Sequence, residues 1–305
     1  MYLIKTLKEN INSEFGRLNL KNQINQKEEF IDLKEAYPDN LVELIKDYNQ
    51  SLHYKTEMFI DHPYFSYPDL RTGLAKTIRD LVVKNSNKIT RILKALKEKD
   101  PVLKEFLSDI KKLAIKEEKS FYITGGFIRD HLINKHPNDI DICTDVDYST
   151  LAEYFKSLNY NVKETGKQFL ILNVSKGELD IEIAALRSDK DNNGAVPGTI
   201  KEDAERRDFT NSALYYCITK EVLVDPNGTA LRDILNVCLN FIGKAKDRIK
   251  EDPIRVLRGY RFISRGWKPT PKTLKSIRSE FDYCIKNSSS TRIMIEIEKL
   301  IKLRR

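Results

Sequence analysis

A glycine pair followed by two alternating aspartates constrains this chain more than any other feature. Residues 121–144 read FYITGGFIRDHLINKHPNDIDICT, a short apolar run followed by Gly125 and Gly126. The apolar run has strand composition, the glycines favour a turn, and residues 127–133 have helical apolar spacing. A proline then ends the helix, and residues 139–143 alternate acidic and apolar side chains. The stretch therefore predicts the order strand, glycine turn, helix, strand.

The two aspartates of the second predicted strand indicate a metal site. Side chains two residues apart share a strand face, so Asp139 and Asp141 should point the same way and the intervening isoleucines into the core. Neighbouring carboxylates repel each other unless a cation lies between them. Carboxylate oxygens suit Mg²⁺, which binds through one or two carboxylates together with substrate phosphates. The glycines would let phosphates approach the backbone, and the following helix would present its positive end to them.

Each part of this pattern also has a structural explanation, because a D-x-D sequence occurs on solvated strand edges and a glycine pair is usually only a turn. Together, however, the parts resemble the signature of the tRNA nucleotidyltransferase and poly(A) polymerase family, the class II (bacterial CCA-adding) branch of the polymerase-β-like superfamily. That signature is G-G-x-x-R-D followed by a D-x-D strand. The matching residues are Gly125, Gly126, Arg129, Asp130, Asp139 and Asp141. The resemblance implies a nucleotidyltransferase.

The resemblance also implies a third carboxylate beside the first two. Asp180 and Glu182 share one face of a predicted strand in the sequence LDIEIAALR. The corresponding family strand ends in Glu-x-x-x-Leu-Arg, which Glu182, Leu186 and Arg187 match. Glu182 is therefore the preferred third carboxylate and Asp180 the reserve. An exposed acidic strand face remains the alternative explanation for either residue.

Residues 202–214, EDAERRDFTNSAL, resemble the family segment R-R-D-F-T-x-N-A, whose Arg and Asp hold triphosphate and ribose. The residues that inherit this binding role are Arg206, Arg207 and Asp208, together with Gly125, Gly126, Arg129 and Asp130 of the first motif. Ser212 replaces the family asparagine and offers a hydroxyl instead of an amide. Asn211 occupies the variable position and does not inherit that role. Without the resemblance, R-R-D would be an ordinary charge cluster at a helix end.

Residues 250–262, KEDPIRVLRGYRF, resemble the family's E-D-x-x-R helix. Asp252 and Arg255 are three residues apart and should share one helix face. The resemblance implies that this pair reads the Watson–Crick edge of the incoming base. Arg has only donors and Asp only acceptors, which together complement the mixed edges of cytosine and adenine. Arg258 and Arg261 continue the spacing and could contact phosphates, although a salt-bridged surface helix would explain Arg261 equally.

Composition limits the partners and the compartment. The 305 residues carry a net charge of +8, which favours a polyanionic partner, nucleic acid first, although a Lys-rich solubilising surface would look the same. The 4 cysteines form no C-x-x-C pair, so we expect reduced thiols. We find neither an apolar run that could span a membrane nor a secretory signal. A cytoplasmic protein without membrane contact is therefore expected.

We predict an α+β protein of about two domains' length, described in three parts. Residues 1–119 form a helical N-terminal region of unknown role. Residues 120–243 form the nucleotidyltransferase head with a small mixed β-sheet, and residues 244–305 a helical neck that carries the base-reading helix. The family resemblance covers this head and neck only, so we expect no long RNA-gripping body and tail. Basic stretches at 84–99 and 111–119 suggest that the N-terminal region holds RNA instead; packing or oligomerisation is the alternative.

The resemblance implies that two Mg²⁺ ions are held by Asp139 and Asp141, with help from Glu182. It further implies that the protein adds nucleotides to an RNA 3′ end, using CTP and ATP to build all or part of the CCA end of tRNA. A poly(A) or A-only enzyme of the same family is the nearest alternative. Nucleotide transfer to a non-RNA acceptor and a non-catalytic RNA-binding module are alternatives of other classes. The complete set of carboxylates argues against the binding module.

Overall fold

The computed structural model describes residues 73–137, 139–166, 170–188 and 196–302. The chain divides into two units, Met1–Tyr54 and Lys55–Arg305, and all described residues belong to the second. The larger part of the predicted N-terminal region therefore lies outside the described residues. The predicted domain limits at residues 119 and 243 stay a prediction.

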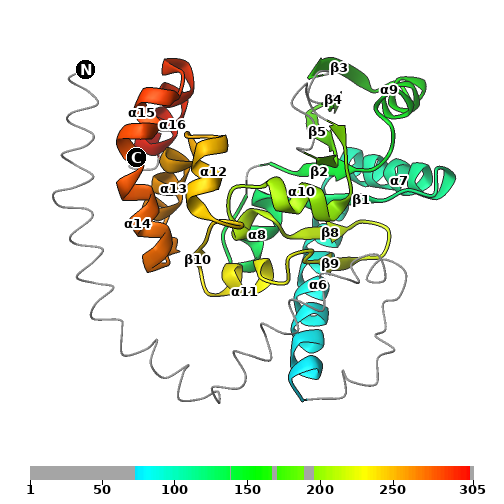
Figure 1. The fold of residues 1–305 in the computed structure, drawn as a ribbon. Coiled ribbons are helices and arrows are strands. Elements are labelled where there is room, and N and C mark those ends of the chain that lie inside the picture. The colour runs from blue at the N-terminus through cyan, green and yellow to red at the C-terminus, as the bar shows by residue number, and fades with distance from the viewer. Residues whose placement is uncertain (1–72, 138, 167–169, 189–195, 303–305) are drawn as a thin grey trace. The chain divides into compact units, whose positions relative to one another are not determined.

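Two helices precede the sheet. Helix α6 spans Gly73–Lys99 and helix α7 spans Pro101–Lys116. Asp100 separates them, because its side chain accepts hydrogen bonds from two backbone amides in the first turn of α7. Pro101 takes the first helical position, where its missing N–H costs nothing. Helix α6 packs against β9 and α8, and α7 packs against β1 (Figure 1).

A seven-stranded sheet forms the centre, in the order β3-β4-β5-β2-β1-β8-β9. Its strands are β1 (Phe121–Thr124), β2 (Asp141–Thr144), β3 (Asn161–Gly166), β4 (Ile171–Lys176), β5 (Leu179–Ala185), β8 (Tyr215–Cys217) and β9 (Val222–Val224). Strands β2 and β5 are parallel and the other neighbours antiparallel, which confirms the predicted mixed sheet. The parallel register places Asp141 opposite Glu182.

Helices cover both faces of this sheet. The head helices are α8 (Gly126–Leu132), α9 (Tyr148–Ser157), α10 (Ile200–Arg206), the 3₁₀ turn η4 (Thr210–Ser212) and α11 (Ala230–Leu235). Helix α10 lies on one face, where Ala204 packs into a buried cluster with Tyr122 and Tyr215. Helices α7 and α9 lie on the other face, joined by Phe106 and Phe155, whose ring centroids are 5.5 Å apart (Figure 1). Two short strands, β6 (Arg187–Ser188) and β7 (Val196–Pro197), pair beside α10.

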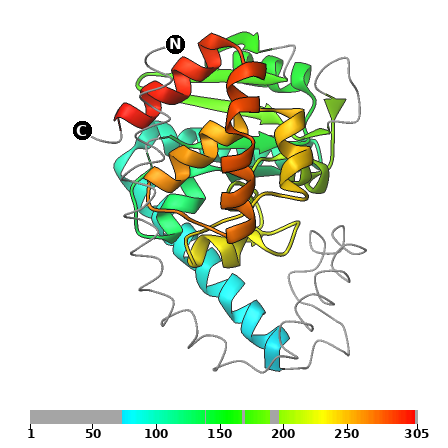
Figure 2. The ribbon, with the colours of Figure 1, turned by 60° about the vertical axis from the view of Figure 1, so that its left-hand side comes forward.

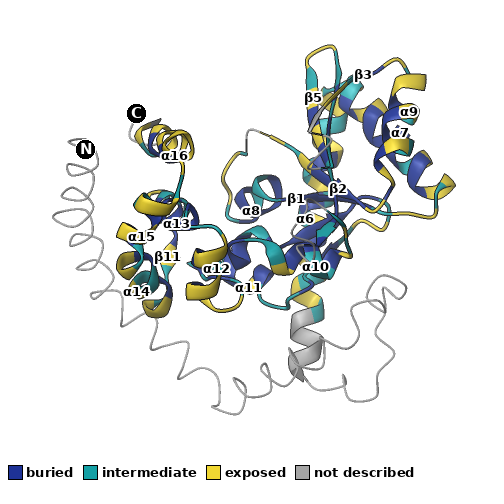
Figure 3. Ribbon diagram, turned by 45° about the horizontal axis from the view of Figure 1, so that its top comes forward, coloured by how far each residue is buried: buried dark blue, intermediate teal, exposed yellow. Residues whose placement is uncertain are grey.

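Five helices follow the sheet and form the neck, which Figure 2 turns toward the viewer. They are α12 (Ala245–Glu251), α13 (Arg255–Ser264), α14 (Pro271–Ser279), α15 (Phe281–Asn287) and α16 (Ser290–Lys302). The parallel strands β10 (Cys238–Leu239) and β11 (Lys268–Pro269) tie the helices to the end of the head. Helix α13 is largely buried, whereas α14 and α16 expose their outer faces (Figure 3).

Two local expectations are wrong. Asp139 lies before β2, which begins at Asp141, so the two aspartates do not share one strand. The E-D-x-x-R segment does not form one helix, because α12 ends before Asp252 and α13 begins at Arg255. The cause is Pro253, which disfavours the helical conformation in the residue before it. Asp252 accordingly has an extended backbone, with φ −144° and ψ 97°.

Two further expectations concern reduced thiols and the lack of a membrane-spanning run. The four cysteines are free thiols, and Cys143, Cys217 and Cys284 are buried. Within the described ranges, no helix combines the length and apolar character needed to cross a membrane.

Candidate active site

A cavity of about 480 Å³ opens where the head meets the neck. It is lined by Thr124, Asp141, Ile142, Cys143, Glu182, Ala184, Arg187, Arg206, Arg207, Asp208, Ser212, Asp252, Arg255 and Arg258. Eight of the predicted site residues are among them, namely Asp141, Glu182, Arg206, Arg207, Asp208, Asp252, Arg255 and Arg258. Four sequence motifs that are far apart in the chain thus meet in one place.

Gly125 allows Asp141 to lie against the turn between β1 and α8. Its φ of +68° belongs to the left-handed region, which L side chains rarely adopt. A Cβ atom at this position would lie 2.9 Å from Oδ2 of Asp141. Any side chain there would strain the backbone and displace the carboxylate. A Cβ at Gly126 would only reach ordinary contact, 3.6 Å from Nη2 of Arg129.

Asp141 and Glu182 form a pair of exposed carboxylates on neighbouring parallel strands. Partial burial raises the pKa of Asp141, and Asp139 raises it further, while Arg207 and Arg129 act in the opposite direction. Partial burial and the charge of Asp141 likewise raise the pKa of Glu182. Desolvation is thus the largest cause of both raised pKa values, and the repulsion between the carboxylates adds to it. A bound cation would relieve the repulsion.

The predicted set of three carboxylates is not assembled in this structure. Among the described residues, no group of three or more His, Cys, Asp or Glu side chains is placed to hold one metal ion. Asp139 affects Asp141 electrostatically but lies outside the strand and is exposed. The reserve residue, Asp180, pairs with Ser175 of β4 and does not line the cavity.

Asp203 holds the two arginines of the cavity wall, a role that the sequence analysis missed. Its side chain is fully buried. Oδ1 accepts hydrogen bonds from Nε and Nη2 of Arg206 at 2.8 and 2.5 Å, and Oδ2 accepts from Nε and Nη2 of Arg207 at 3.0 and 2.9 Å. The hydroxyl of Tyr215 also donates to Oδ2, at 2.7 Å. The spacing of three and four residues on a helix was the signal that could have identified Asp203.

Asp208 connects the head to the neck. Its carboxylate contacts Nε of Arg255 at 2.7 Å and Nη1 of Arg258 at 2.6 Å. Arg255 also donates to Glu251 at 2.8 Å and to the carbonyl oxygens of Arg248 and Arg206 at 2.6 and 3.2 Å. The buried Arg255 is therefore largely engaged within the protein.

Asp252 lines the same cavity, and its carbonyl oxygen accepts a hydrogen bond from the Arg255 amide at 3.2 Å, but the two side chains bond to other partners. Its Oδ2 accepts a hydrogen bond from Arg292 of α16 at 2.8 Å. Its Oδ1 is buried and has no hydrogen-bond partner among the described residues. The predicted base-reading pair is thus brought to one cavity, with the aspartate offering a free acceptor.

Comparison with known proteins identifies the region that builds most of this cavity. Residues 121–239 match the model of the poly(A) polymerase head domain. The match covers less than half of the chain. Proteins that share this head domain are nucleotidyltransferases, and this family generally uses a divalent metal ion.

Relatives of the head domain include enzymes of two kinds. Poly(A) polymerase I of Escherichia coli O6:H1 is 32% identical over 174 residues, which cover 51% of this chain and 36% of that protein. The human mitochondrial CCA tRNA nucleotidyltransferase 1 is 32% identical over 207 residues, 65% of this chain and 47% of that protein. The chain thus spans between about a third and a half of the length of these curated relatives.

A solved structure shares the fold. The crystal structure of the Bacillus stearothermophilus CCA-adding enzyme in complex with CTP superposes with a TM-score of 0.58 at 25% identity. The match covers 66% of this chain and 49% of that chain. The fold is therefore that of a CCA-adding nucleotidyltransferase.

Three further predicted site residues, which do not line the cavity, form ion pairs inside the protein instead. Arg129 and Asp130 are buried and form an ion pair at 2.9 Å, and Asp130 also contacts Arg265 of the neck at 3.2 Å. Arg261 is paired with Glu296 of α16 at 2.8 Å. The described contacts of Arg261 agree with the salt-bridge explanation, and none of the three lines the cavity.

Ser212 lines the cavity in place of the family asparagine, whereas its neighbour Asn211 is buried. The Ser212 hydroxyl donates to the side-chain oxygen of Asn211 at 3.3 Å. This placement agrees with the expectation that Asn211 does not take over the ribose contact.

Proposed function

We propose that this chain adds nucleotides to the 3′ end of RNA, using CTP and ATP to build all or part of the CCA end of tRNA. The observation that carries the proposal is the single cavity that combines a repelling carboxylate pair, arginines for a triphosphate and a free buried acceptor for a base. The CCA-adding relative and the CTP-bound structure of the same fold support this choice of substrates.

The carboxylates fit the divalent ions that this chemistry requires. Asp141 and Glu182 would hold Mg²⁺, with Asp139 within electrostatic reach, because the two carboxylates lie opposite each other on β2 and β5 and line the cavity. When bound, two Mg²⁺ ions would activate the attacking 3′-hydroxyl and stabilise the leaving pyrophosphate. Hard oxygen ligands of this kind favour Mg²⁺ over softer metals.

The arginines would neutralise the triphosphate of the incoming nucleotide. Arg206 and Arg207 line the cavity in orientations that Asp203 holds, and Arg258 lines it from the neck. A guanidinium held in advance needs no reorganisation when charge develops on the phosphates, so it lowers the barrier through electrostatic stabilisation. The contribution of these residues is positioning and charge, with no covalent step.

The base would be read by Asp252 and Arg255. Oδ1 of Asp252 can accept a hydrogen bond from the exocyclic amino group that cytosine and adenine both carry. Arg255 has five N–H donors, of which four are used in the contacts with Asp208, Glu251 and the two carbonyl oxygens. One donor remains for the ring nitrogen beside that amino group.

The test uses tRNA that lacks its 3′ CCA end, incubated with Mg²⁺ and each labelled nucleotide in turn and then in pairs. Two C residues followed by one A are expected, with UTP and GTP rejected. A long tail from ATP alone would instead identify a poly(A)-adding enzyme, which the Escherichia coli relative favours. No incorporation under any of these conditions would refute transfer to RNA.

A further inference from the structure

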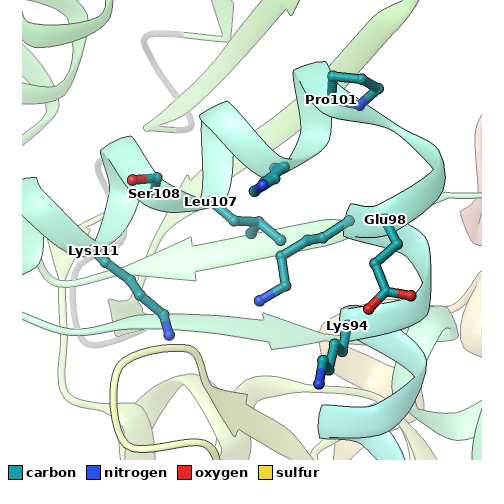
Figure 4. Close-up of a pocket in the computed structure, with 8 residues that line it drawn as sticks. Lys94, Glu98, Pro101, Leu107, Ser108 and Lys111 are labelled. Carbon is teal, nitrogen blue, oxygen red and sulfur yellow. The ribbon is translucent and has the colours of Figure 1, made fainter.

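The corner between α6 and α7 holds a second cavity, of about 640 Å³ (Figure 4). Its lining residues are Lys94, Lys97, Glu98, Pro101, Lys104, Leu107, Ser108 and Lys111. Four of the eight are lysines and one is a glutamate, so the groove has an excess of positive charge. It shares no lining residue with the carboxylate cavity.

Helix geometry brings these lysines together from two directions. Lys94 and Lys97 are three residues apart on α6, and Lys104 and Lys111 are seven apart on α7, so each pair lies on one helix face. Asp100 ends one helix and caps the next, which makes both faces line the same groove. The lysine-lined surface therefore results from the α6–α7 corner.

Most of this charge is not neutralised by the protein. Lys94, Lys97 and Lys104 have no ion-pair partner in the described part of the chain, whereas Lys111 contacts Glu221 at 2.9 Å. Just outside the groove the lysines of α7 are paired. Lys112 contacts Asp109 at 2.9 Å and Lys116 contacts Glu117 at 3.4 Å.

We propose that this groove, defined by Lys94, Lys97 and Lys104, binds the phosphate backbone of RNA. No aromatic side chain lines it, so bases have no ring on which to stack. Unpaired ammonium groups suit phosphate oxygens, and such contacts position a nucleic acid without reading its sequence. This inference rests on the proposed function, because the RNA bound in the groove is the same RNA whose 3′ end is extended.

The groove would hold a part of the RNA distant from the reacting end. It lies in the α6–α7 layer, whereas the carboxylate cavity is walled by the end of α10, on the other face of the sheet (Figure 1). A short acceptor that occupies only the carboxylate cavity should therefore not depend on these lysines. A full-length RNA should depend on them.

The first test measures RNA binding against salt concentration. The triple variant Lys94→Gln, Lys97→Gln and Lys104→Gln should bind full-length tRNA about tenfold more weakly at 0.1 M salt, and its plot of log affinity against log salt should be less steep by about 2 to 3. The control removes the same charge from the neck, with Lys268→Gln, Lys272→Gln and Lys275→Gln, all exposed and away from the groove. If both variants show the same slope of log affinity against log salt, the proposal is overturned. That result is also the one expected if the groove binds an acidic protein instead of RNA.

The second test separates this proposal from the proposed function. Nucleotide incorporation is measured with full-length tRNA and with a short 3′ oligonucleotide, for the wild type and both triple variants. The groove variant should lose efficiency on the full-length RNA only, through KM and not kcat. Equal loss on both acceptors would overturn the groove assignment. If the wild type incorporates nothing, the proposed reaction fails, and the salt dependence still decides whether the groove binds RNA.

Discussion

Two aspartates beside the same cavity have opposite environments. Asp203 is fully buried; burial raises its pKa, but Arg207, Arg206 and the Tyr215 hydroxyl outweigh that effect and bring the pKa down to about 2. Asp141 is exposed, yet partial desolvation, with Asp139, raises its pKa by more than Arg207 and Arg129 lower it. The protein itself neutralises the first charge and leaves the second for a ligand. The first position thus supports the site, and the second is available for chemistry.

The largest effect should come from removing the uncompensated carboxylate. Asp141→Ala should lower nucleotide incorporation by about 10³-fold or more, because loss of a metal ligand costs several kcal/mol of transition-state stabilisation. Circular dichroism should show an unchanged fold. Transfer near the wild-type rate by this variant, with Mg²⁺ present, would refute the assignment of Asp141.

Removing the compensated carboxylate should instead affect the fold. Asp203→Asn leaves two partly buried arginines without their counter-charge and should lower the free energy of unfolding by about 3 to 5 kcal/mol. Urea denaturation measures this loss. Glu205→Gln, an exposed change of equal charge on the same helix, should shift stability by no more than about 0.5 kcal/mol.

The pH dependence gives an independent control for Asp203. Its pKa falls from the ordinary 3.8 to about 2 in the folded protein, so its stabilising contribution is full above pH 3.8 and is lost as the pH falls through 2. Acid titration of stability between pH 4 and 2 should therefore be less steep in Asp203→Asn than in the wild type. Identical profiles would contradict the buried network.

An intermediate effect is expected at Asp252, which has one paired and one free carboxylate oxygen. Asp252→Ala should reduce the preference for CTP and ATP over UTP and GTP by about 10- to 100-fold, since one buried hydrogen bond discriminates by about 1 to 3 kcal/mol. The ratio of kcat/KM values for the four nucleotides measures this change. Arg292→Gln, which removes only the partner of Oδ2, serves as the control. Equal losses for all four nucleotides would show that Asp252 is structural.

The smallest expected effect is a gain in stability, from a second change at Asp141. Asp141→Asn removes a partly desolvated charge and its repulsion with Asp139 and Glu182, and should stabilise the metal-free protein at neutral pH, by less than about 1 kcal/mol because solvent screens an exposed carboxylate. A raised pKa means that the ionised form is the unfavourable one, so this gain should disappear as the pH falls through the pKa of Asp141. Thermal denaturation with and without Mg²⁺ at several pH values tests it, and a metal-free loss of stability at neutral pH would contradict the repulsion.

The glycine–aspartate stretch determined the first three elements of the head by itself. Its apolar spacing and turn residues predicted β1, α8 and β2 in order, because these elements depend on local periodicity. The hairpin of β4 and β5 has a local signal as well, a Lys-Gly turn in which Gly177 has a φ of +59°. The third carboxylate followed from the family resemblance, and the parallel register places Glu182 opposite Asp141.

Only the tertiary structure decided which charges remain free. Arg129, Asp130 and Arg261 belong to recognisable motifs, yet ion pairs inside the protein engage all three. Lys94 and Lys104 belong to no motif, yet the α6–α7 corner places both ammonium groups in one groove, without an ion-pair partner among the described residues. An ion pair needs a partner within about 4 Å in space. That partner can come from a distant part of the sequence. Sequence spacing therefore indicated which groups could act, and packing determined which of them are available.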